Sequence, residues 1–469
     1  MTGPRKSLAV ALSTACALAL FAAAPAPAVT ADPAEAATDP YFPASGNQGY
    51  DVGHYDLALD LTPRTHELVA VATVTAEARR RLDRFALDYS GPPVERVTVD
   101  GREAAYRRDG AKLTVVPAQA LAPGREFTVE VRYRGHPEAI DDPALGRYGW
   151  IDTDDGAVTL DEPDGARTWY PVNDDLGDKA TYTFHLTTPA GVTALANGER
   201  QGPPRTVAGR TTVTWEMARP MASYLAMVAI GDFEVHRSLV GGIPNVTAYD
   251  PAIDGDDGFL HRTTGQVVEW GAGRFGRYPF DSMGGIIDPT TAGYSLETQS
   301  RPVYDTPPDE ATVVHENAHQ WFGDSVTPRS WRDIWLNEGF ATYVEWLWQE
   351  EHGGPGARQT FDDHYATPAA DPFWQGQTGD PGRDRIFDYD LVYVRGAMTL
   401  QALRTTIGDQ AFFRLLRAWA ERYRYGNAET CDLVRLAEEV SHRDLGPLFR
   451  AWLYTAGKPA DPAADPADG

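Results

Sequence analysis

Two histidines four residues apart, with a glutamate beside the first, offer the clearest chemistry in this chain of 469 residues. On an α-helix, His315 and His319 would lie on one face, one turn apart, so both imidazoles could bind a single metal ion. Glu316 would point about 100° around the helix, close to that ion without binding it, which suits a general base. A catalytic Zn²⁺ usually takes three protein ligands and a water. Glu338, separated from His319 by residues 320–337, is the candidate third ligand.

The same segment has a second interpretation, a solvated helix with two surface histidines. Histidine is scarce, at 11 of 469 residues. His-Glu-x-x-His with glutamate at one fixed later position therefore arises by chance in roughly one such chain in a thousand. The zinc motif that continues with glycine and histidine is excluded, because Phe322 and Ser325 occupy those two places. The pattern favours a zinc site with two histidines and a distant glutamate.

The composition narrows the classes of partner. The formal net charge is −25, which argues against nucleic acids and anionic membrane surfaces. Hydrophobic residues make up 42 % of the chain, enough to fill large cores, and the length suggests two to three domains.

Residues 1–31 are expected to be a signal peptide for export. Arg5 and Lys6 form a basic start, an apolar run covers 8–24, and small residues follow at a cleavage site. A membrane-spanning helix and a lipid anchor at Cys16 are the alternatives, disfavoured by the short apolar run and a poorly placed leucine. We therefore expect a secreted, extracellular protein without stable membrane insertion. Cleavage would leave Cys431 alone, without a partner for an internal disulfide.

Alternating hydrophobicity follows a linker at residues 32–40. From Tyr55 onward apolar residues recur at every second position, and Asp100-Gly101 and Asp109-Gly110 are typical of hairpin turns. Residues 41–235 are predicted to form an N-terminal domain with a large antiparallel sheet, as a sandwich or saddle.

The periodicity becomes helical after Gly258, which predicts a mainly helical domain over 236–457. The metal-binding helix is expected to start at a capping sequence over 306–309, with proline in its first turn, and to run to about Phe322. The Gly-, Pro- and Asp-rich stretch 353–390 is expected to be a long loop near the cleft. Residues 458–469 are predicted to be a disordered tail.

The metal motif together with Trp335–Tyr343 (WLNEGFATY) resembles the aminopeptidase N family of zinc exopeptidases. The resemblance covers about 41–455. It implies one Zn²⁺ per chain, bound by the gluzincin pattern, in a thermolysin-like domain that follows a β-rich domain. The segment Asp444–Leu453 resembles the end of the family's catalytic domain. Larger relatives continue with a helical domain, whereas only the predicted tail follows here, so we expect a more open cleft.

The resemblance also assigns three further residues. Glu297, in Tyr294–Thr298, corresponds to the glutamate that binds the substrate's free α-ammonium group, and Glu162 matches a second ammonium-binding residue. Tyr393 matches the tyrosine that donates to the oxyanion, with Tyr389 as a second candidate. Without the resemblance, the two glutamates are ordinary loop or turn acids and the tyrosine is a core residue.

We expect a secreted zinc aminopeptidase that removes N-terminal residues from peptides. His315, His319 and Glu338 would hold the zinc ion, Glu316 would act as the general base, and Tyr393 would stabilise the oxyanion. Two alternatives stay open. One is a zinc endopeptidase of the same fold. The other is a peptide-binding module without catalysis.

Overall fold

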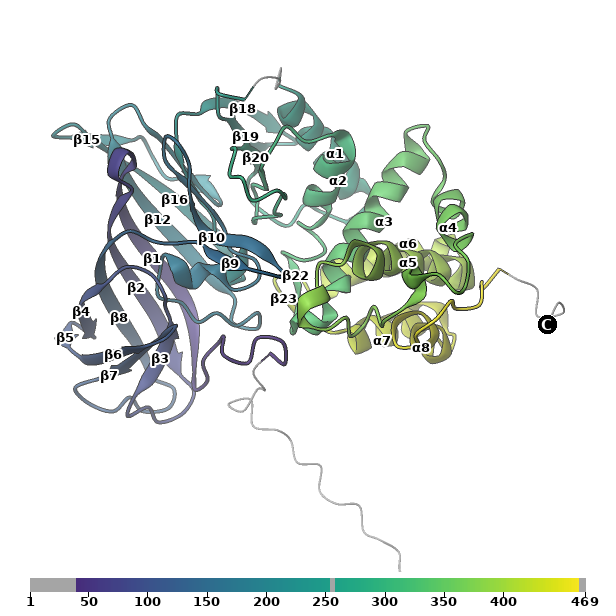
Figure 1. The fold of residues 1–469 in the computed structure, drawn as a ribbon, viewed down its shortest axis with the longest axis horizontal. Helices are drawn as coiled ribbons and strands as arrows, with labels where there is room; N and C mark the ends of the chain where they lie inside the picture. The colour runs from purple at the N-terminus through teal and green to yellow at the C-terminus, as the bar shows by residue number, and fades with distance from the viewer. Residues whose placement is uncertain (1–38, 254–257, 464–469) are drawn as a thin grey trace, which may run out of the picture.

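The computed structural model describes residues 39–253 and 258–463. The predicted signal peptide and nearly all of the predicted linker lie outside these residues. A β-rich N-terminal part and a mainly helical part lie side by side (Figure 1). No helix within the described ranges is long and apolar enough to cross a bilayer.

A nine-stranded sheet forms the body of the N-terminal part. Alternate residues of its long strands are buried, as the period-two pattern predicts. The strand order is β14 (Glu199–Arg200), β16 (Arg210–Met221), β12 (Ala180–Pro189), β1 (Tyr50–Thr62), β2 (Glu67–Ala78), β8 (Glu126–Gly135), β4 (Val94–Val99) and β5 (Arg102–Glu103), with β15 (Arg205–Val207) pairing with β16.

The sheet is antiparallel, as expected, except at one pairing, because β1 and β12 pair in parallel. The long stretch of chain between them supplies the crossover that parallel pairing needs. The Asp100-Gly101 turn is confirmed. Both residues have positive φ, and they join β4 to β5 with Val99 opposite Arg102. At the second predicted turn, Asp109 pairs with Lys112, so the turn lies one residue later than expected.

Two smaller sheets complete this part. One is β3 (Phe85–Asp88), β7 (Lys112–Val116) and β6 (Ala105–Asp109). The other contains β13 (Thr193–Ala196), β17 (Val228–Gly231), β11 (Ala157–Leu160), β10 (Gly146–Asp152) and β9 (Ile140–Asp142). The second sheet matters for function, because the segment after β11 and the turn between β9 and β10 both reach the cavity described below.

The second part begins with a four-stranded sheet whose first strand starts at Glu234, next to the predicted boundary. It comprises β18 (Glu234–Val240), β19 (Ile243–Tyr249), β20 (Met283–Ile287) and β21 (Val303–Tyr304). The helices are α1 (Phe259–Phe275), α2 (Glu310–Ala318), α3 (Trp335–Glu351), α4 (Ala357–Tyr365), α5 (Arg395–Ile407), α6 (Asp409–Arg422), α7 (Thr430–Ser441) and α8 (Gly446–Leu453). A short parallel pair, β22 (Val326–Pro328) and β23 (Gly426–Ala428), lies beside them.

The metal-motif helix α2 is shorter than predicted at both ends. Asp309 is its N-cap and accepts a hydrogen bond from the Thr312 amide at 2.8 Å, so both prolines precede the helix. The helix ends at Ala318, where the chain enters a tight turn that reaches Gly323 at φ +138°. His319 therefore lies just beyond the last helical residue.

Two other expectations need correction. The stretch 353–390 was expected to be a loop but contains α4, which is held by Phe361 against Trp452 with ring centroids 5.6 Å apart. Residues 458–463 of the predicted disordered tail are described by the structure, and they contact helix α4. The Tyr365 hydroxyl donates to the Pro459 carbonyl, and Arg358 pairs with Asp461.

Helices α3 and α5 make a very close approach. A Cβ atom on Gly339 would lie 2.8 Å from the Cα of Gly396, and one on Gly396 would lie 2.7 Å from the Cα of Gly339. Only glycine at both positions permits this separation, since real Cβ contacts are longer.

Candidate active site

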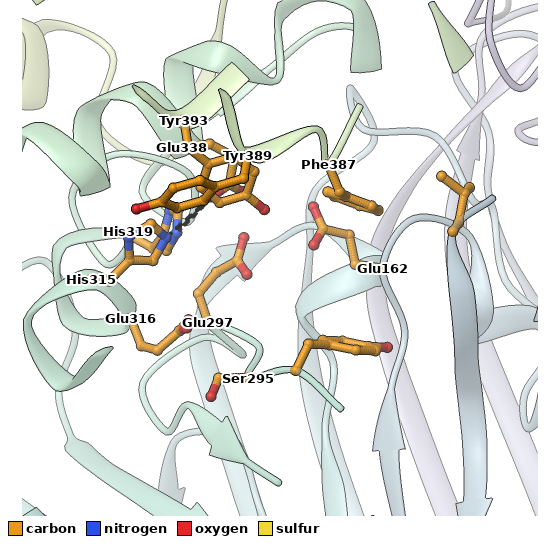
Figure 2. A pocket seen from close by; sticks show the side chains of 12 residues that line it. Glu162, Ser295, Glu297, His315, Glu316, His319, Glu338, Phe387, Tyr389 and Tyr393 are labelled. Carbon is orange, nitrogen blue, oxygen red and sulfur yellow. Dashed lines mark hydrogen bonds and ion pairs between the residues drawn. The ribbon is translucent and has the colours of Figure 1, made fainter. Parts of the chain in front are cut away.

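All seven predicted site residues line one cavity of about 370 Å³ between the two parts. Figure 2 shows Glu338, His315 and His319 at one side and Glu162 toward the other, with Glu297 between them. The full lining consists of Leu145, Glu162, Tyr294, Ser295, Glu297, His315, Glu316, His319, Glu338, Phe387, Tyr389 and Tyr393.

Packing of α2 against α3 brings the predicted metal ligands together. Oε2 of Glu338 lies 3.2 Å from Nε2 of His315 and 3.5 Å from Nε2 of His319. The ligand atoms of the three residues all lie within 4.8 Å of one another. Glu338 is in the first turn of α3, and the histidines are at the end of α2, so the helices meet at the ends that carry the ligands.

The other ring nitrogen of each histidine has a fixed partner. Nδ1 of His315 donates to Oε1 of Glu345 at 2.6 Å, and Nδ1 of His319 donates to the Phe322 carbonyl at 3.1 Å. Both Nε2 atoms are therefore left to face Glu338. Such contacts set the ring orientation and tautomer of metal-binding histidines.

Sequence reasoning missed Glu345. It lies seven residues after Glu338 on the same helix, two turns further along the same face. That spacing was the available signal, but it identifies a partner for His315 only once α2 is known to pack on α3.

The donor set fits zinc. Zn–N and Zn–O bonds of about 2.0–2.2 Å in a tetrahedron imply ligand atoms roughly 3.3–3.6 Å apart. The two distances from Glu338 are 3.2 and 3.5 Å. Two imidazole nitrogens and one carboxylate oxygen are a common catalytic zinc set, in which one position is left for water.

The three predicted ligands, His315, His319 and Glu338, are called the triad below. Their electrostatic surroundings favour a bound cation. Burial raises the pKa of Glu338, but His319 and His315 outweigh it and hold that pKa at about 2. Burial lowers the pKa of His319, but Glu297 and Glu338 raise it to about 9. Four carboxyl groups, those of Glu162, Glu297, Glu316 and Glu338, thus surround two imidazoles.

Glu316 lies next to the triad and is 6 % exposed. Burial, reinforced by Glu297 and Glu338, raises its pKa to about 8 against the opposing effect of the histidines. A carboxyl group with a pKa near neutrality can both accept and return a proton, as general acid–base catalysis requires.

Glu297 and Glu162 form the opposite part of the cavity. One carboxylate oxygen of each of these residues and one of Glu338 lie within 4.8 Å of one another. Glu297 belongs to the segment between β20 and β21, where the Leu296 amide and the Val303 carbonyl pair at 2.8 Å. Glu162 follows β11 at a cis peptide bond with Pro163. Its buried Oε1 atom has no hydrogen-bond partner among the residues that the structure describes.

A positive partner would stabilise the ionised form of this pair of buried acids. Burial and then Glu297 raise the pKa of Glu162 well above its ordinary value, and burial raises that of Glu297. An incoming ammonium group would satisfy both carboxylates, since buried charges need an opposite charge and hydrogen bonds.

The two candidate tyrosines differ in position. The ring of Tyr393 lies parallel to that of His315, with centroids 5.8 Å apart, and burial raises its pKa well above the ordinary value, so the hydroxyl stays a donor. Tyr389 contacts Tyr393 at 5.7 Å and is 64 % exposed, at the mouth of the cavity. Both lie on one π-helical turn, Tyr389–Val394. The geometry favours Tyr393 as the residue nearer the triad.

Together, the His-Glu-x-x-His helix, the distant glutamate and the buried acids define a metallopeptidase class of site. Two family models match the chain: the peptidase M1 N-terminal domain over residues 52–225 and the peptidase family M1 domain over 296–452. This chain belongs to peptidase family M1.

Solved structures give the same result. The M1 zinc metallopeptidase from Deinococcus radiodurans is 30 % identical, with a TM-score of 0.84, over 92 % of this chain and all of that chain. A variant of it bound to a Tyr-Ser-Ala substrate is 31 % identical, with a TM-score of 0.82, over 91 % of this chain and 99 % of that chain.

The curated relatives are longer. Aminopeptidase N of Streptomyces lividans is 28 % identical over 87 % of this chain and 50 % of its own length. Leucyl aminopeptidase of Saccharolobus solfataricus is 24 % identical over 87 % of this chain and 54 % of its own length. The chain thus spans about half the length of the curated relatives it matches.

Proposed function

We propose that this chain is a zinc-dependent aminopeptidase that hydrolyses the first peptide bond of substrates with a free amino terminus. The observation that carries the proposal is the position of the Glu162–Glu297 pair beside the metal ligands. In one residue, the nitrogen and the carbonyl carbon are about 2.5 Å apart. A terminal ammonium held by these acids would therefore place only the first carbonyl at the triad.

Each catalytic role follows from a position in the cavity. His315, His319 and Glu338 would hold the zinc ion, which when bound activates water and polarises the scissile carbonyl. Glu316 takes a proton from the attacking water and passes it to the leaving amine. The Tyr393 hydroxyl donates to the oxyanion. Glu297 and Glu162 bind the ammonium group and fix the register of the peptide.

The relatives support this choice of substrate. A Deinococcus radiodurans variant has been solved with a Tyr-Ser-Ala substrate, and a two-domain M1 zinc metallopeptidase variant has been solved with L-tryptophan, a free amino acid. Ligands of both kinds carry a free α-amine.

Amino-acid p-nitroanilides and their N-acetylated forms provide the test. We expect hydrolysis of the free-amine compounds only, and loss of that activity with a chelator and its return with Zn²⁺. Equal hydrolysis of the acetylated compounds would instead support the endopeptidase alternative. Zinc-loaded protein that binds peptides and hydrolyses neither compound would support the non-catalytic binding module.

We also propose export of the protein, on the basis of the basic start, apolar run and small-residue site in residues 1–31. Expression of the full chain in a bacterial host should release a shortened protein outside the cytoplasm, with its new N-terminus near residue 29–32. Full-length protein retained in the cytoplasm would contradict export without affecting the proposed chemistry.

A further inference from the structure

The part of the cavity away from the zinc ligands is built by segments from both parts of the molecule. Leu145 comes from the turn between β9 and β10 of the N-terminal part, and Phe387 comes from the segment before α5. Figure 2 shows Phe387 beside Glu162, on the side away from His315. Leu145 and Phe387 are both partly buried and pack on the core.

One ion pair joins these two segments. Asp142, the last residue of β9, pairs with Arg383 through both carboxylate oxygens. Nη1 of Arg383 lies 3.2 Å from Oδ1, and Nη2 makes a closer contact with Oδ2. A two-point contact of this kind fixes the relative orientation of its partners as well as their separation.

Asp142 also shapes the turn that carries Leu145. Its Oδ1 accepts hydrogen bonds from the amides of Ala144 at 2.9 Å and Leu145 at 3.1 Å. The Asp142 side chain is 14 % exposed, and its hydrogen bond with Arg383 holds its pKa at about 2. The carboxylate therefore stays charged at neutral pH and binds the turn and the guanidinium at the same time.

Arg383 is tied in turn to the segment that carries Phe387. It lies four residues before Phe387, in a short 3-10 turn, Arg383–Arg385. Its guanidinium carbon lies over the Phe42 ring, 5.3 Å from the ring centroid. Asp388 then caps the π-helical turn by accepting from the Leu391 amide at 3.0 Å. The ion pair is therefore close to Phe387 along the chain, and the turns on both sides of Phe387 are held in place.

The geometry points to Asp142 and Arg383 as positioning residues that set the preference for the first side chain of the substrate, an inference that rests on the proposed function. With the ammonium at Glu162 and Glu297, the side chain on the same Cα extends past Glu162 toward Phe387 and Leu145. A large apolar side chain reaches the surface formed by Phe387 and Leu145, whereas the methyl group of alanine does not. The Asp142–Arg383 ion pair holds this surface in place for large apolar side chains.

The test compares L-phenylalanine and L-alanine p-nitroanilides in Asp142→Asn, Arg383→Met and the double variant. Asparagine keeps an acceptor for the turn amides, and methionine keeps an unbranched stem over Phe42. We expect the phenylalanine-to-alanine ratio of kcat/KM to fall about tenfold in each single variant, the scale of a lost apolar contact. Because the two residues act as one unit, the double variant should fall no further.

A second ion pair between the two parts supplies the control. Arg219 on β16 pairs with Asp281 before β20 through two contacts, at 2.9 and 3.1 Å, and neither residue lines the cavity. Arg219→Met and Asp281→Asn should leave the ratio unchanged. Zinc content and the thermal unfolding midpoint would show that every variant is folded.

A binding measurement tests this inference independently of catalytic turnover. The Kd values of L-phenylalaninamide and L-alaninamide for the zinc-loaded protein, measured by calorimetry, should show the same loss of preference. Unchanged ratios in both assays, or equal losses in the Arg219–Asp281 controls, would overturn the role of the pair. A wild-type protein that hydrolyses neither anilide would overturn the proposed function, while the Kd ratios would still decide the role of the pair.

Discussion

Oε1 of Glu345 lies 2.6 Å from Nδ1 of His315, on the ring nitrogen opposite the one that faces Glu338. The carboxylate fixes both the tautomer and the orientation of a proposed zinc ligand. We predict that Glu345→Gln lowers zinc affinity about 10- to 100-fold. Competition with a chromogenic chelator measures this change. Glu439→Gln, at an exposed position on α7, should have no effect, and an unaltered affinity in Glu345→Gln would exclude the orienting role.

Glu316 is predicted to be the proton carrier. Glu316→Gln keeps the size of the side chain but removes the basic oxygen, so kcat should fall by about 10²-fold or more. Zinc should remain bound at one ion per chain, because Glu316 is not in the predicted ligand set. Parallel measurement of hydrolysis and metal content decides the matter. A zinc-loaded variant with the wild-type rate would show that another group accepts the proton.

Tyr393 is predicted to stabilise the oxyanion. Tyr393→Phe removes one hydroxyl from a ring that otherwise keeps its packing against His315, so kcat should fall about 10²- to 10³-fold with little change in KM. Tyr389→Phe is the matched control, four residues earlier on the same turn, and should retain most activity. The opposite ranking of the two variants would move the donor role to Tyr389.

The acid pair is predicted to recognise the ammonium group. Glu297→Gln and Glu162→Gln each remove one charged hydrogen-bond acceptor, a loss of roughly 10- to 100-fold in affinity for free-amine ligands. Inhibition by L-phenylalaninamide compared with its N-acetyl derivative measures this preference. The preference for the free amine should shrink in both variants. If it persists in both, the amine binds elsewhere.

Asp288, at the end of β20, makes stability depend on pH. It is 1 % exposed, and neither carboxyl oxygen has a hydrogen-bond partner within the described structure. Burial, followed by Asp155, Asp250 and Asp305, raises its pKa to about 8.

The folded protein therefore keeps a proton that the unfolded chain releases above about pH 4. The stability that this proton provides is fully present below pH 4 and is lost as the pH rises through 8, by at most about 1.4 kcal/mol per pH unit. In denaturant titrations from pH 5 to 8, Asp288→Asn should gain steadily on the wild type, and the exposed control Asp154→Asn should not. Parallel curves for wild type and Asp288→Asn would mean that the carboxyl group is ionised when folded.

The parts of the site that could be predicted from sequence are those fixed by helical spacing. His315, Glu316 and His319 follow from one turn of helix, and Glu338 follows from the resemblance of the segment around it. Glu345 could not be found in this way, because its partner His315 belongs to another helix. Leu145 and Phe387 were also missed, since each reaches the cavity on a segment whose path depends on contacts made after folding.

In the fold too, features set by local sequence could be predicted, and features set by contacts between distant segments could not. The alternating pattern of β1 and β2 predicts strands directly, but the parallel pairing of β1 with β12 depends on residues more than a hundred positions apart. Helix α4 was missed because its interior face rests on few apolar residues, chiefly Phe361. Helix α2 ends at Ala318 because the next turn tightens, with the amides of Gln320 and Trp321 donating to the carbonyls three residues before them.

The contact between Gly339 and Gly396 brings together two site residues, Glu338 and Tyr393, that are far apart in the sequence. Gly339 directly follows Glu338, and Gly396 lies three residues after Tyr393. The backbone contact at this crossing places the proposed metal ligand Glu338 and the proposed oxyanion donor Tyr393 in one cavity, where both could act on the same carbonyl group. One added methyl at either glycine would wedge the helices apart and widen the gap between those two groups. Two residues that have no side chain to offer a substrate thus determine whether the catalytic groups are within reach of each other.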